Sequence, residues 1–550
     1  MKAFYSGLRN WSMALVLMAS VIWFARGGFA QGTLTHSYRF DELSGTLTDG
    51  TTLVNQATGV ADATFYIAGS GTGTVEDGVL RLLGTNNSNG AYISLPSDVV
   101  GTKTAITLDA VVTPHTVYNF SRLFDIGGSS NGSRFFGALY GNNGGNTYTQ
   151  FEGAGSAASS YGLTTGTEYR LTITQSNGSL RYYIDGEVVG MGNVSQDLST
   201  RSGDSNFIGK SHWTGDSYAD MSISSFDVYD AAAGPTTIRT LYKNDQGANL
   251  DITSAQKVDS LIASSVGYFA ASSNNNLYDF SNNHQYNGGT PYRIVENSTV
   301  SGDISSLLNN SGWSFQDGYN NDGSAPQNRY MDIYAAANTA NPLMDISGSL
   351  TLVTRINIDS FDSVINGSEN FNYLIRSGMS NGTQTTYVLG TTANSANGNE
   401  GGYLQFRLTP EGSTTAISLS SDYQLEEDTW YDVAGVFDAD EKTASLYILD
   451  TETGNLLWSY VFGEDDGVNF SSLNTLSGER RNFMLMETEN NRGGSFLQYM
   501  DFASVWDTAL SLSDIQALTS TGAQVPEPST WALLLIGAFA LLRLRKWRRV

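Results

Sequence analysis

The stretch EYRLTITQSNGSLRYYIDGEVVG, from Glu168 to Gly190, contains two hairpins that share one strand. Apolar and polar residues alternate on both sides of the turn at Ser176-Asn177-Gly178, and this period of two is typical of a half-buried β-strand. The second turn is Asp185-Gly186, a dipeptide that tolerates the positive φ angles of a two-residue hairpin turn. The stretch therefore predicts three consecutive antiparallel strands.

The composition extends this prediction to the whole chain. Among 550 residues there are 59 Gly and 9 Pro, and Asn-Gly, Asp-Gly and Ser-Gly pairs recur between short runs rich in Tyr, Ile, Val and Thr. Such turns between short strands indicate an all-β protein, and the length suggests more than one domain. The absence of cysteine excludes disulfides, thiolate metal sites and a cysteine nucleophile.

The charge excludes one large class of partner. The chain carries 29 basic and 54 acidic residues, and residues 31–525 alone keep 21 basic and 53 acidic ones. Phosphate contacts need a basic surface, so we expect no nucleic-acid partner. A surplus of carboxylates is typical of a protein that must stay soluble outside the cell.

The N-terminus has the layout of a secretory signal peptide. A basic start is followed by the apolar run WSMALVLMASVIWF and by the small residues Gly28 and Ala30. We expect cleavage between Ala30 and Gln31, which makes residues 1–30 a signal peptide. The alternative is a retained anchor, but fourteen residues are short for a span that needs about 20.

The C-terminus is VPEPSTWALLLIGAFALLRLRKWRRV, residues 525–550. The apolar residues 531–542 form about 18 Å of helix, a marginal membrane span, and the cations after it orient the last residue toward the cytoplasm. Val525-Pro526-Glu527-Pro528, the apolar helix and the terminal cations together resemble the PEP-CTERM sorting signal.

That resemblance implies an exported protein of a Gram-negative bacterium. It implies processing by an exosortase, transient anchoring in the inner membrane, and delivery to the cell envelope or the extracellular matrix. The ordinary alternative is a tail anchor with a chance Pro-Glu-Pro.

The body of the chain repeats one order of landmarks. In the first half these are SYRFDELSGTLTDG, AYISLPSDVVGTKTAITLDAVVTP, SRLFDIGG, the double hairpin and SISSFDVYDAA with a short helical run. The second half has counterparts in the same order, at residues 277–288, 342–359, 373–378, 428–450 and 496–518.

The landmarks resemble the LamG-like jelly roll of the concanavalin A-like lectin/glucanase superfamily. The resemblance covers residues 34–242 and 266–520 and implies two tandem antiparallel β-sandwiches. Residues 243–265 then form a linker with a short helix, for which Ser254 is a candidate N-cap.

The resemblance also implies a calcium site. In this family an aspartate of the N-terminal loop and one of the closing strand often meet near one calcium ion, a cation that suits hard oxygen ligands. These positions fall on Asp49 in the first domain, where Ser224 replaces the second aspartate, and on Asp279 and Asp501 in the second domain. The alternative is that these aspartates bond the backbone of their own turns.

Trp213 and His212 are the candidate glycan-binding residues. They lie in KSHWTGD, a turn-rich segment after a predicted strand, where an exposed aromatic ring can stack on a sugar. The alternative is a tryptophan that caps one end of the core. Trp430, Trp458 and Trp506 occupy predicted strands, where we expect core positions.

We predict no catalytic residues. Glucanases of this superfamily carry three alternating acids on one strand, and the nearest match, METEN, has only Glu487 and Glu489. The four histidines have no metal-binding spacing, and there is no Gly-x-Ser-x-Gly motif.

The sequence thus predicts a non-enzymatic exported protein that binds extracellular polysaccharide or another surface ligand, and it predicts structural calcium. One alternative is a purely structural matrix protein without a discrete ligand. The other is a glycan-active enzyme of the same superfamily.

Overall fold

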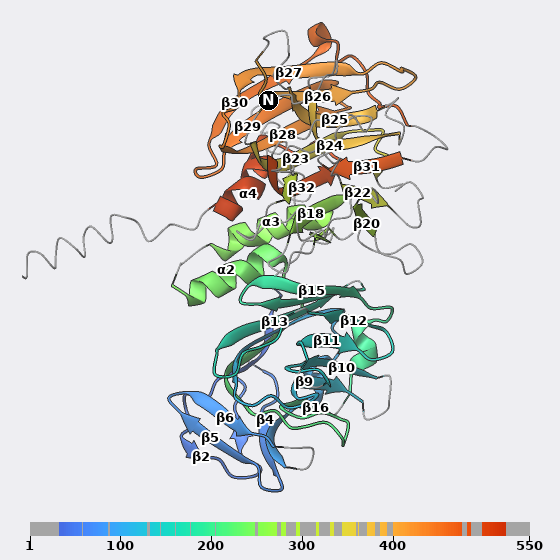
Figure 1. Cartoon of the computed structure of the whole chain (residues 1–550). Helices are drawn as coiled ribbons and strands as arrows, with labels where there is room; N and C mark the ends of the chain where they lie inside the picture. Colours follow the sequence, from blue (N-terminus) through green and yellow to red (C-terminus); the bar gives the residue numbers. More distant parts are fainter. Residues whose placement is uncertain are drawn as a thin grey trace, which may run out of the picture.

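The computed structural model describes residues 32–523 except 58, 86–88, 129–132, 143–144, 160, 177, 204, 248–250, 272–276, 282–292, 297–314, 318–330, 335–343, 359–360, 362–370, 380–384, 393–399, 476–480 and 486–497. The described chain forms two β-sandwiches that follow one another, with three helices between them (Figure 1).

The first sandwich consists of two antiparallel sheets. Sheet A has the order β15 (Glu187–Asn193), β14 (Ser179–Ile184), β13 (Tyr169–Ser176), β8 (Ala105–Pro114), β17 (Met221–Tyr229), β6 (Val79–Leu83), β5 (Thr72–Glu76) and β2 (Gly45–Thr46), with β1 (Leu34–Tyr38) also on β17. Sheet B has the order β12 (Gly155–Ala158), β11 (Tyr148–Phe151), β10 (Arg134–Ala138), β9 (Arg122–Gly127), β16 (Asn206–Ile208), β7 (Gly90–Leu95), β4 (Ala63–Ala68) and β3 (Thr52–Leu53).

The second sandwich is built in the same way. Sheet C has the order β30 (Leu456–Phe462), β29 (Thr443–Asp450), β28 (Trp430–Asp438), β23 (Leu350–Ile358), β32 (Gln498–Trp506), β18 (Gly267–Ala271) and β19 (Leu277–Asp279), with β21 (Phe315–Asp317) also on β32. Sheet D has the order β27 (Ile417–Gln424), β26 (Tyr403–Leu408), β25 (Thr385–Thr392), β24 (Phe371–Met379), β31 (Arg481–Leu485), β22 (Met331–Tyr334) and β20 (Arg293–Glu296).

The predicted double hairpin is present in both sandwiches. In the first, β13, β14 and β15 pair in sequence, and Asp185 and Gly186 have φ angles of 52° and 81°. Two positive φ angles in a two-residue loop match the right-handed twist of the strands it joins. In the second sandwich β28, β29 and β30 pair in the same way. The repeated order of landmarks therefore corresponds to a repeated strand order.

Each sandwich has its own hydrophobic core between its two sheets. Leu108 and Leu171 of sheet A pack in one cluster with Phe65 and Phe124 of sheet B. The second core joins side chains of sheets C and D, among them Leu352, Val433, Leu389 and Phe406. Between bulges, alternation along the strands places every second side chain in these cores.

The two sandwiches share a helical layer. The helices are α2 (Pro235–Asp245), α3 (Ile252–Ser264) and α4 (Leu512–Ala523), and short 3-10 turns occur at Ser97–Val99, Leu198–Arg201 and Glu464–Asp466. A third hydrophobic cluster combines Tyr183 of β14, Ile238 of α2, Ile262 of α3 and Trp506 of β32. The segment after the first sandwich is therefore packed against both domains.

Two details of the sequence interpretation change here. Asp251, three residues before the expected Ser254, caps α3 by accepting hydrogen bonds from the backbone N–H groups of Thr253 and Ser254. Trp506 is fully buried, as expected for a core tryptophan, whereas Trp430 and Trp458 are only half-buried.

No helix in the described ranges is long and apolar enough to cross a membrane. The predicted signal peptide with its cleavage site at Ala30 and Gln31, the sorting motif Val525-Pro526-Glu527-Pro528, the helix 531–542, and Glu487 and Glu489 all lie outside those ranges.

Candidate functional site

Both candidate glycan-binding residues lie in one loop after β16. The loop begins at Gly209, whose φ of 81° favours glycine, and closes where the N–H of Ala219 donates to the carbonyl of Gly209 at 2.9 Å. Inside it, the N–H of Asp216 donates to the carbonyl of Trp213 at 3.2 Å. We call residues 209–219 the tryptophan loop.

His212 attaches this loop to the sheet. Its backbone N–H donates to Oδ2 of the fully buried Asp125 on β9 at 3.0 Å, and its Nδ1 lies 2.7 Å from Oδ1 of the same carboxylate. Only 5% of the His212 side chain is exposed. His212 therefore positions the loop and has little surface to offer a ligand.

Trp213 lies over the strands β9 and β10. Its ring makes an edge-to-face contact with Phe136 at 5.6 Å, and the guanidinium of Arg134 lies 4.0 Å from its centroid. Arg122, 4.0 Å above the Phe136 ring, is paired with Asp216 of the loop at 2.8 Å. Trp213 remains partly exposed. It both covers buried cations and presents part of an aromatic ring to solvent.

Further aromatic residues continue across the outer face of sheet B. Tyr66 of β4 is directly opposite Tyr92 of β7, and their rings stack at 5.5 Å. Phe207 of β16 meets the Tyr92 ring edge-to-face at 5.7 Å, and Tyr218 lies 6.0 Å from Tyr92. Tyr66 is 36% exposed, and Tyr92, Phe207 and Tyr218 are partly exposed.

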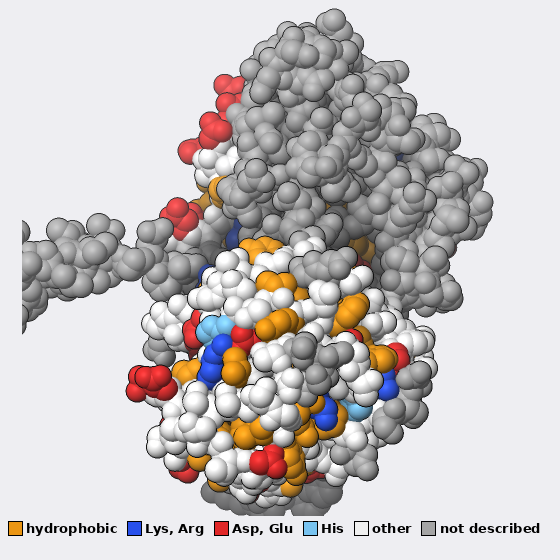
Figure 2. Space-filling view, turned by 60° about the horizontal axis from the view of Figure 1, so that its bottom comes forward, with side chains coloured by type: hydrophobic (Ala, Val, Ile, Leu, Met, Phe, Trp, Pro, Cys, Tyr) orange, Lys and Arg blue, Asp and Glu red, His pale blue; other side chains and the backbone are white. Residues whose placement is uncertain are grey.

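The register explains why these rings share one side. Thr64, Ser94, Phe207, Asp125 and Phe136 are direct neighbours across five strands, so they point to the same face. We call the outward-facing rings the aromatic face; its members are Tyr66, Tyr92, Phe136, Tyr148, Phe207, Trp213 and Tyr218. Figure 2 shows hydrophobic side chains gathered with basic ones on the first sandwich.

The sequence interpretation found only Trp213 among these residues. A signal for Tyr66 was present, because Phe65 and Tyr66 are adjacent in a strand and must point to opposite faces. Phe65 is fully buried in the core, so Tyr66 points outward.

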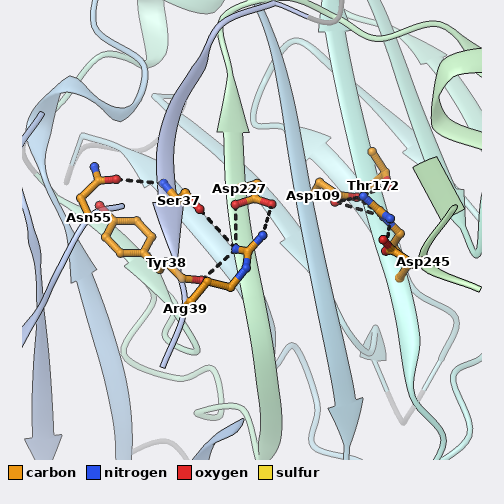
Figure 3. A network of polar contacts seen from close by, with 9 residues as sticks. Ser37, Tyr38, Arg39, Asn55, Asp109, Thr172, Asp227 and Asp245 are labelled. Atoms are coloured by element: carbon orange, nitrogen blue, oxygen red, sulfur yellow. Dashed lines mark hydrogen bonds and ion pairs between the residues drawn. The ribbon is translucent and has the colours of Figure 1, made fainter. Parts of the chain in front are cut away.

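The opposite sheet carries polar networks on its outer face (Figure 3). Arg170 pairs with Asp109 at 2.7 Å and also with Asp245 at the end of α2. Arg39 holds Asp227 through two hydrogen bonds of 2.8 and 2.7 Å. Nearby acids raise the pKa of Arg170 despite its burial. α2 lies against this part of sheet A. The ion pair between Arg170 and Asp245 therefore attaches the helix to the sheet.

The second sandwich has a corresponding buried ion pair, in which the arginine and the aspartate have exchanged strands. Arg355 of β23 donates to the fully buried Asp432 of β28 at 2.8 and 2.9 Å, and to the carbonyl of Thr519 in α4 at 2.7 Å. Burial raises the pKa of Asp432, and Arg355 opposes that shift. The closing helix of each domain is thus tied to a buried ion pair of its sheet.

The predicted metal ligands have partners of their own. Asp49 is exposed and accepts a hydrogen bond from the N–H of Ile67 at 2.7 Å. Asp279 accepts from the N–H groups of Tyr268 and Ser281 at 3.0 and 2.9 Å, and its other oxygen is buried without a hydrogen bond. Burial raises the pKa of Asp279.

Asp501 and Ser224 occupy equivalent positions, because each is the unpaired residue of a bulge in the closing strand. Oδ2 of Asp501 lies 3.7 Å from Nη1 of Arg355. Burial raises the pKa of the Asp501 carboxyl to about 6. Among the described residues, no group of three His, Asp or Glu side chains is placed to hold a metal ion. The calcium sites stay a prediction.

Two family models match this chain. Residues 87–239 match the concanavalin A-like lectin/glucanases superfamily, and residues 524–549 match the PEP-CTERM protein-sorting motif. No curated protein matches the sequence.

Solved structures resemble parts of the chain. Domain 4 of an extracellular arabinanase from Geobacillus stearothermophilus, in complex with arabinotriose, is 17% identical with a TM-score of 0.31, over 38% of this chain and 98% of that one. A Trypanosoma rangeli sialidase with 2,3-difluorosialic acid is 17% identical with a TM-score of 0.30, over 40% of this chain and 33% of that one. The CBM40 of Ruminococcus gnavus IT-sialidase, bound to α2,3-sialyllactose, is 15% identical with a TM-score of 0.23, over 32% and 86%.

This chain spans nearly all of the arabinanase domain and about a third of the sialidase. The C-terminal match indicates export, exosortase processing and sorting to the cell surface. The protein is therefore a PEP-CTERM sorting-motif protein with a concanavalin A-like lectin/glucanase domain, followed by a second β-sandwich.

Proposed function

We propose that this protein binds a polysaccharide of the cell surface or extracellular matrix through the aromatic face of its first sandwich. The observation that carries the proposal is the set of partly exposed rings on the outer side of sheet B, where Tyr92 contacts both Tyr66 and Phe207. A surface cluster of this kind marks an interaction site more often than scattered apolar residues do.

The chemistry of the rings suits a sugar. An aromatic ring has a negative face that attracts the C–H edge of a pyranose, and a tyrosine hydroxyl adds a hydrogen-bonding group at the rim. The rings are also held in place before a ligand arrives. Tyr66, Tyr92 and Phe207 stand on paired strands, and Asp125 fixes the tryptophan loop. Little side-chain freedom is then lost on binding.

The remaining parts of the chain serve delivery and structure in this proposal. Both sandwiches are LamG-like jelly rolls, and calcium bound at Asp279 and Asp501, or at Asp49, stabilises their loops. The signal peptide is removed after Ala30, and residues 531–542 hold the precursor in the inner membrane of a Gram-negative bacterium until an exosortase acts at the Pro-Glu-Pro motif. The role of the mature protein is binding, without catalysis.

The second candidate is a purely structural matrix protein. The shared cluster of Tyr183, Ile238, Ile262 and Trp506 favours it, because this cluster joins both sandwiches and the helices into one continuous body. A protein joined in this way can act as a spacer without a discrete ligand.

The test is retention of the full chain, in mild detergent, on a panel of immobilised polysaccharides with calcium or with a chelator. We expect Tyr66→Ala and Trp213→Ala to lower retention, whereas Tyr460→Ala, which removes a 47% exposed tyrosine of β30, leaves it unchanged. Circular dichroism checks that each variant is folded.

If the chelator abolishes the retention of wild type, the result would support the calcium site. Equal retention of wild type and Tyr66→Ala would contradict a role for the aromatic face. Retention on no polysaccharide would favour the structural candidate.

A further inference from the structure

Lys210 occupies an unusual place on the aromatic face. It follows β16 at the start of the tryptophan loop, and its ammonium lies 4.3 Å from the Tyr92 ring centroid and 4.5 Å from that of Phe207. The side chain is half-buried. The rings of Tyr92 and Phe207 therefore take the place of part of the water around the Lys210 ammonium.

The other basic residues of the first sandwich have anionic or carbonyl partners. Their pairs include Arg39 with Asp227, Arg81 with Asp220, Arg122 with Asp216, Arg170 with Asp109 and Lys103 with the carbonyl of Asp98. Within the described ranges Lys210 has ring contacts but no hydrogen bond and no salt bridge.

Burial lowers the pKa of Lys210, and no carboxylate within the described ranges opposes this shift. This isolation is notable in a chain with 54 acidic and 29 basic residues, where counterions are abundant. An ammonium on a half-buried side chain, with no counterion among the described residues, loses hydration that the ring faces restore only in part. An incoming carboxylate would complete the missing ion pair.

We infer that Lys210, together with Tyr66, Tyr92 and Phe207, forms a subsite for a sugar that carries a carboxylate. The rings receive the C–H face of the sugar, and the ammonium receives its carboxylate. This inference rests on the proposed polysaccharide binding and narrows it to acidic polymers, those built from uronic acids or similar sugars.

Geometry supports a single subsite for both groups. Tyr66 and Tyr92 stack at 5.5 Å, and Lys210 lies above the same Tyr92 ring. The stacked tyrosines and the ammonium therefore meet at Tyr92, so the apolar and the cationic parts of the subsite are adjacent. Because the cation is partly desolvated, the pair is screened less by salt than an exposed one.

The test compares polygalacturonate and alginate with their carboxyl-reduced, neutral forms, using affinity measurements on the full chain in mild detergent. We expect wild type to prefer the acidic form by about tenfold to a hundredfold, the range of a charge-assisted hydrogen bond. Lys210→Gln should abolish this preference, and Lys210→Arg should retain most of it.

The matched control is Lys442→Gln, which removes one charge from an exposed turn of the second sandwich and should change nothing. Equal affinity of wild type for acidic and reduced polymers would overturn the inference and leave polysaccharide binding intact. An acidic preference that survives in Lys210→Gln would overturn it as well. If wild type binds neither the acidic nor the reduced polymers, and binds no neutral polysaccharide, then both the subsite and the proposed polysaccharide binding are wrong.

Discussion

Asp259 links two helices, and its replacement by asparagine should change how stability depends on pH. The residue belongs to α3, is fully buried, and accepts hydrogen bonds from the first N–H groups of α2. Its Oδ1 lies 2.9 Å from the N–H nitrogen of Thr236 and its Oδ2 lies 2.8 Å from that of Thr237. Gly234, the N-cap of α2, has no side chain for this task, and a Cβ there would clash with the Asp259 carboxyl.

Burial raises the pKa of Asp259 from its ordinary 3.8 to about 6, although the N–H donors act in the opposite direction. The folded protein therefore binds this proton more tightly than the unfolded chain does. The resulting stabilisation is fully present below about pH 4 and is lost as the pH rises through about 6. At about 1.4 kcal/mol per pKa unit, the loss amounts to about 3 kcal/mol.

Asp259→Asn has no such titration. One of its two cap hydrogen bonds is lost because the amide NH₂ cannot accept, which costs about 1 kcal/mol at every pH. The free energy of unfolding of the variant, relative to wild type, should thus rise by about 3 kcal/mol between about pH 4 and pH 7. Urea unfolding at several pH values, followed by tryptophan fluorescence, measures this difference.

Asp251→Asn is the matched control. Asp251 also caps a helix, α3, but it is exposed, and the hydroxyl of Ser254 is the main cause that lowers its pKa. Its stabilisation is present above its ordinary pKa and lost on acidification, so Asp251→Asn should lose stability relative to wild type as the pH rises from about 3 to 6. A pH-independent difference for Asp259→Asn, or the same sign for both variants, would refute this reasoning.

Three further predictions concern stability, and urea unfolding measures each. Arg355→Met leaves Asp432 buried without its partner and should cost about 3–5 kcal/mol, whereas adding Asp432→Leu should recover most of this loss; a double variant that costs the sum of the singles would contradict the pairing. Trp506→Ala opens a cavity in the shared helical layer and should cost about 3–5 kcal/mol, and a cost under about 1 kcal/mol would mean that the layer contributes little. Gly209→Ala forces a Cβ onto a residue with φ of 81° and within 3.1 Å of a leucine methyl, so it should cost about 1–2 kcal/mol or more and lower polysaccharide retention. Gly412→Ala has a similar φ of 75° but open space, and an equal cost for both variants would exclude the close contact as a cause.

Features that depend only on neighbouring residues could be predicted from the sequence. Alternation and the Asp185-Gly186 turn predicted the double hairpin, because a period of two and positive φ are properties of adjacent residues. The same logic, applied to the order of the landmarks, predicted that the second half repeats the first. The C-terminal motif could be read without any structure because its processing depends on a short segment.

The candidate site could be predicted only in part. Trp213 was identified as a tryptophan in a turn, but His212 beside it proved to be held by Asp125, a residue 87 positions away. Asp125 gave no signal, since a single aspartate in an apolar strand has no local pattern that names its partner.

The sequence by itself therefore determined the all-β class, the repeated strand pattern and the route of export, all of which depend on neighbouring residues. The tertiary structure alone decided which side of each sheet is covered. It placed α2 against the charges of sheet A and aligned Tyr66, Tyr92 and Phe207 on sheet B. In the part of the chain that the structure describes, it left Lys210 without a counterion. The physical reason is that alternation assigns a side chain to one of two faces, whereas what covers a face depends on packing between segments far apart in the chain.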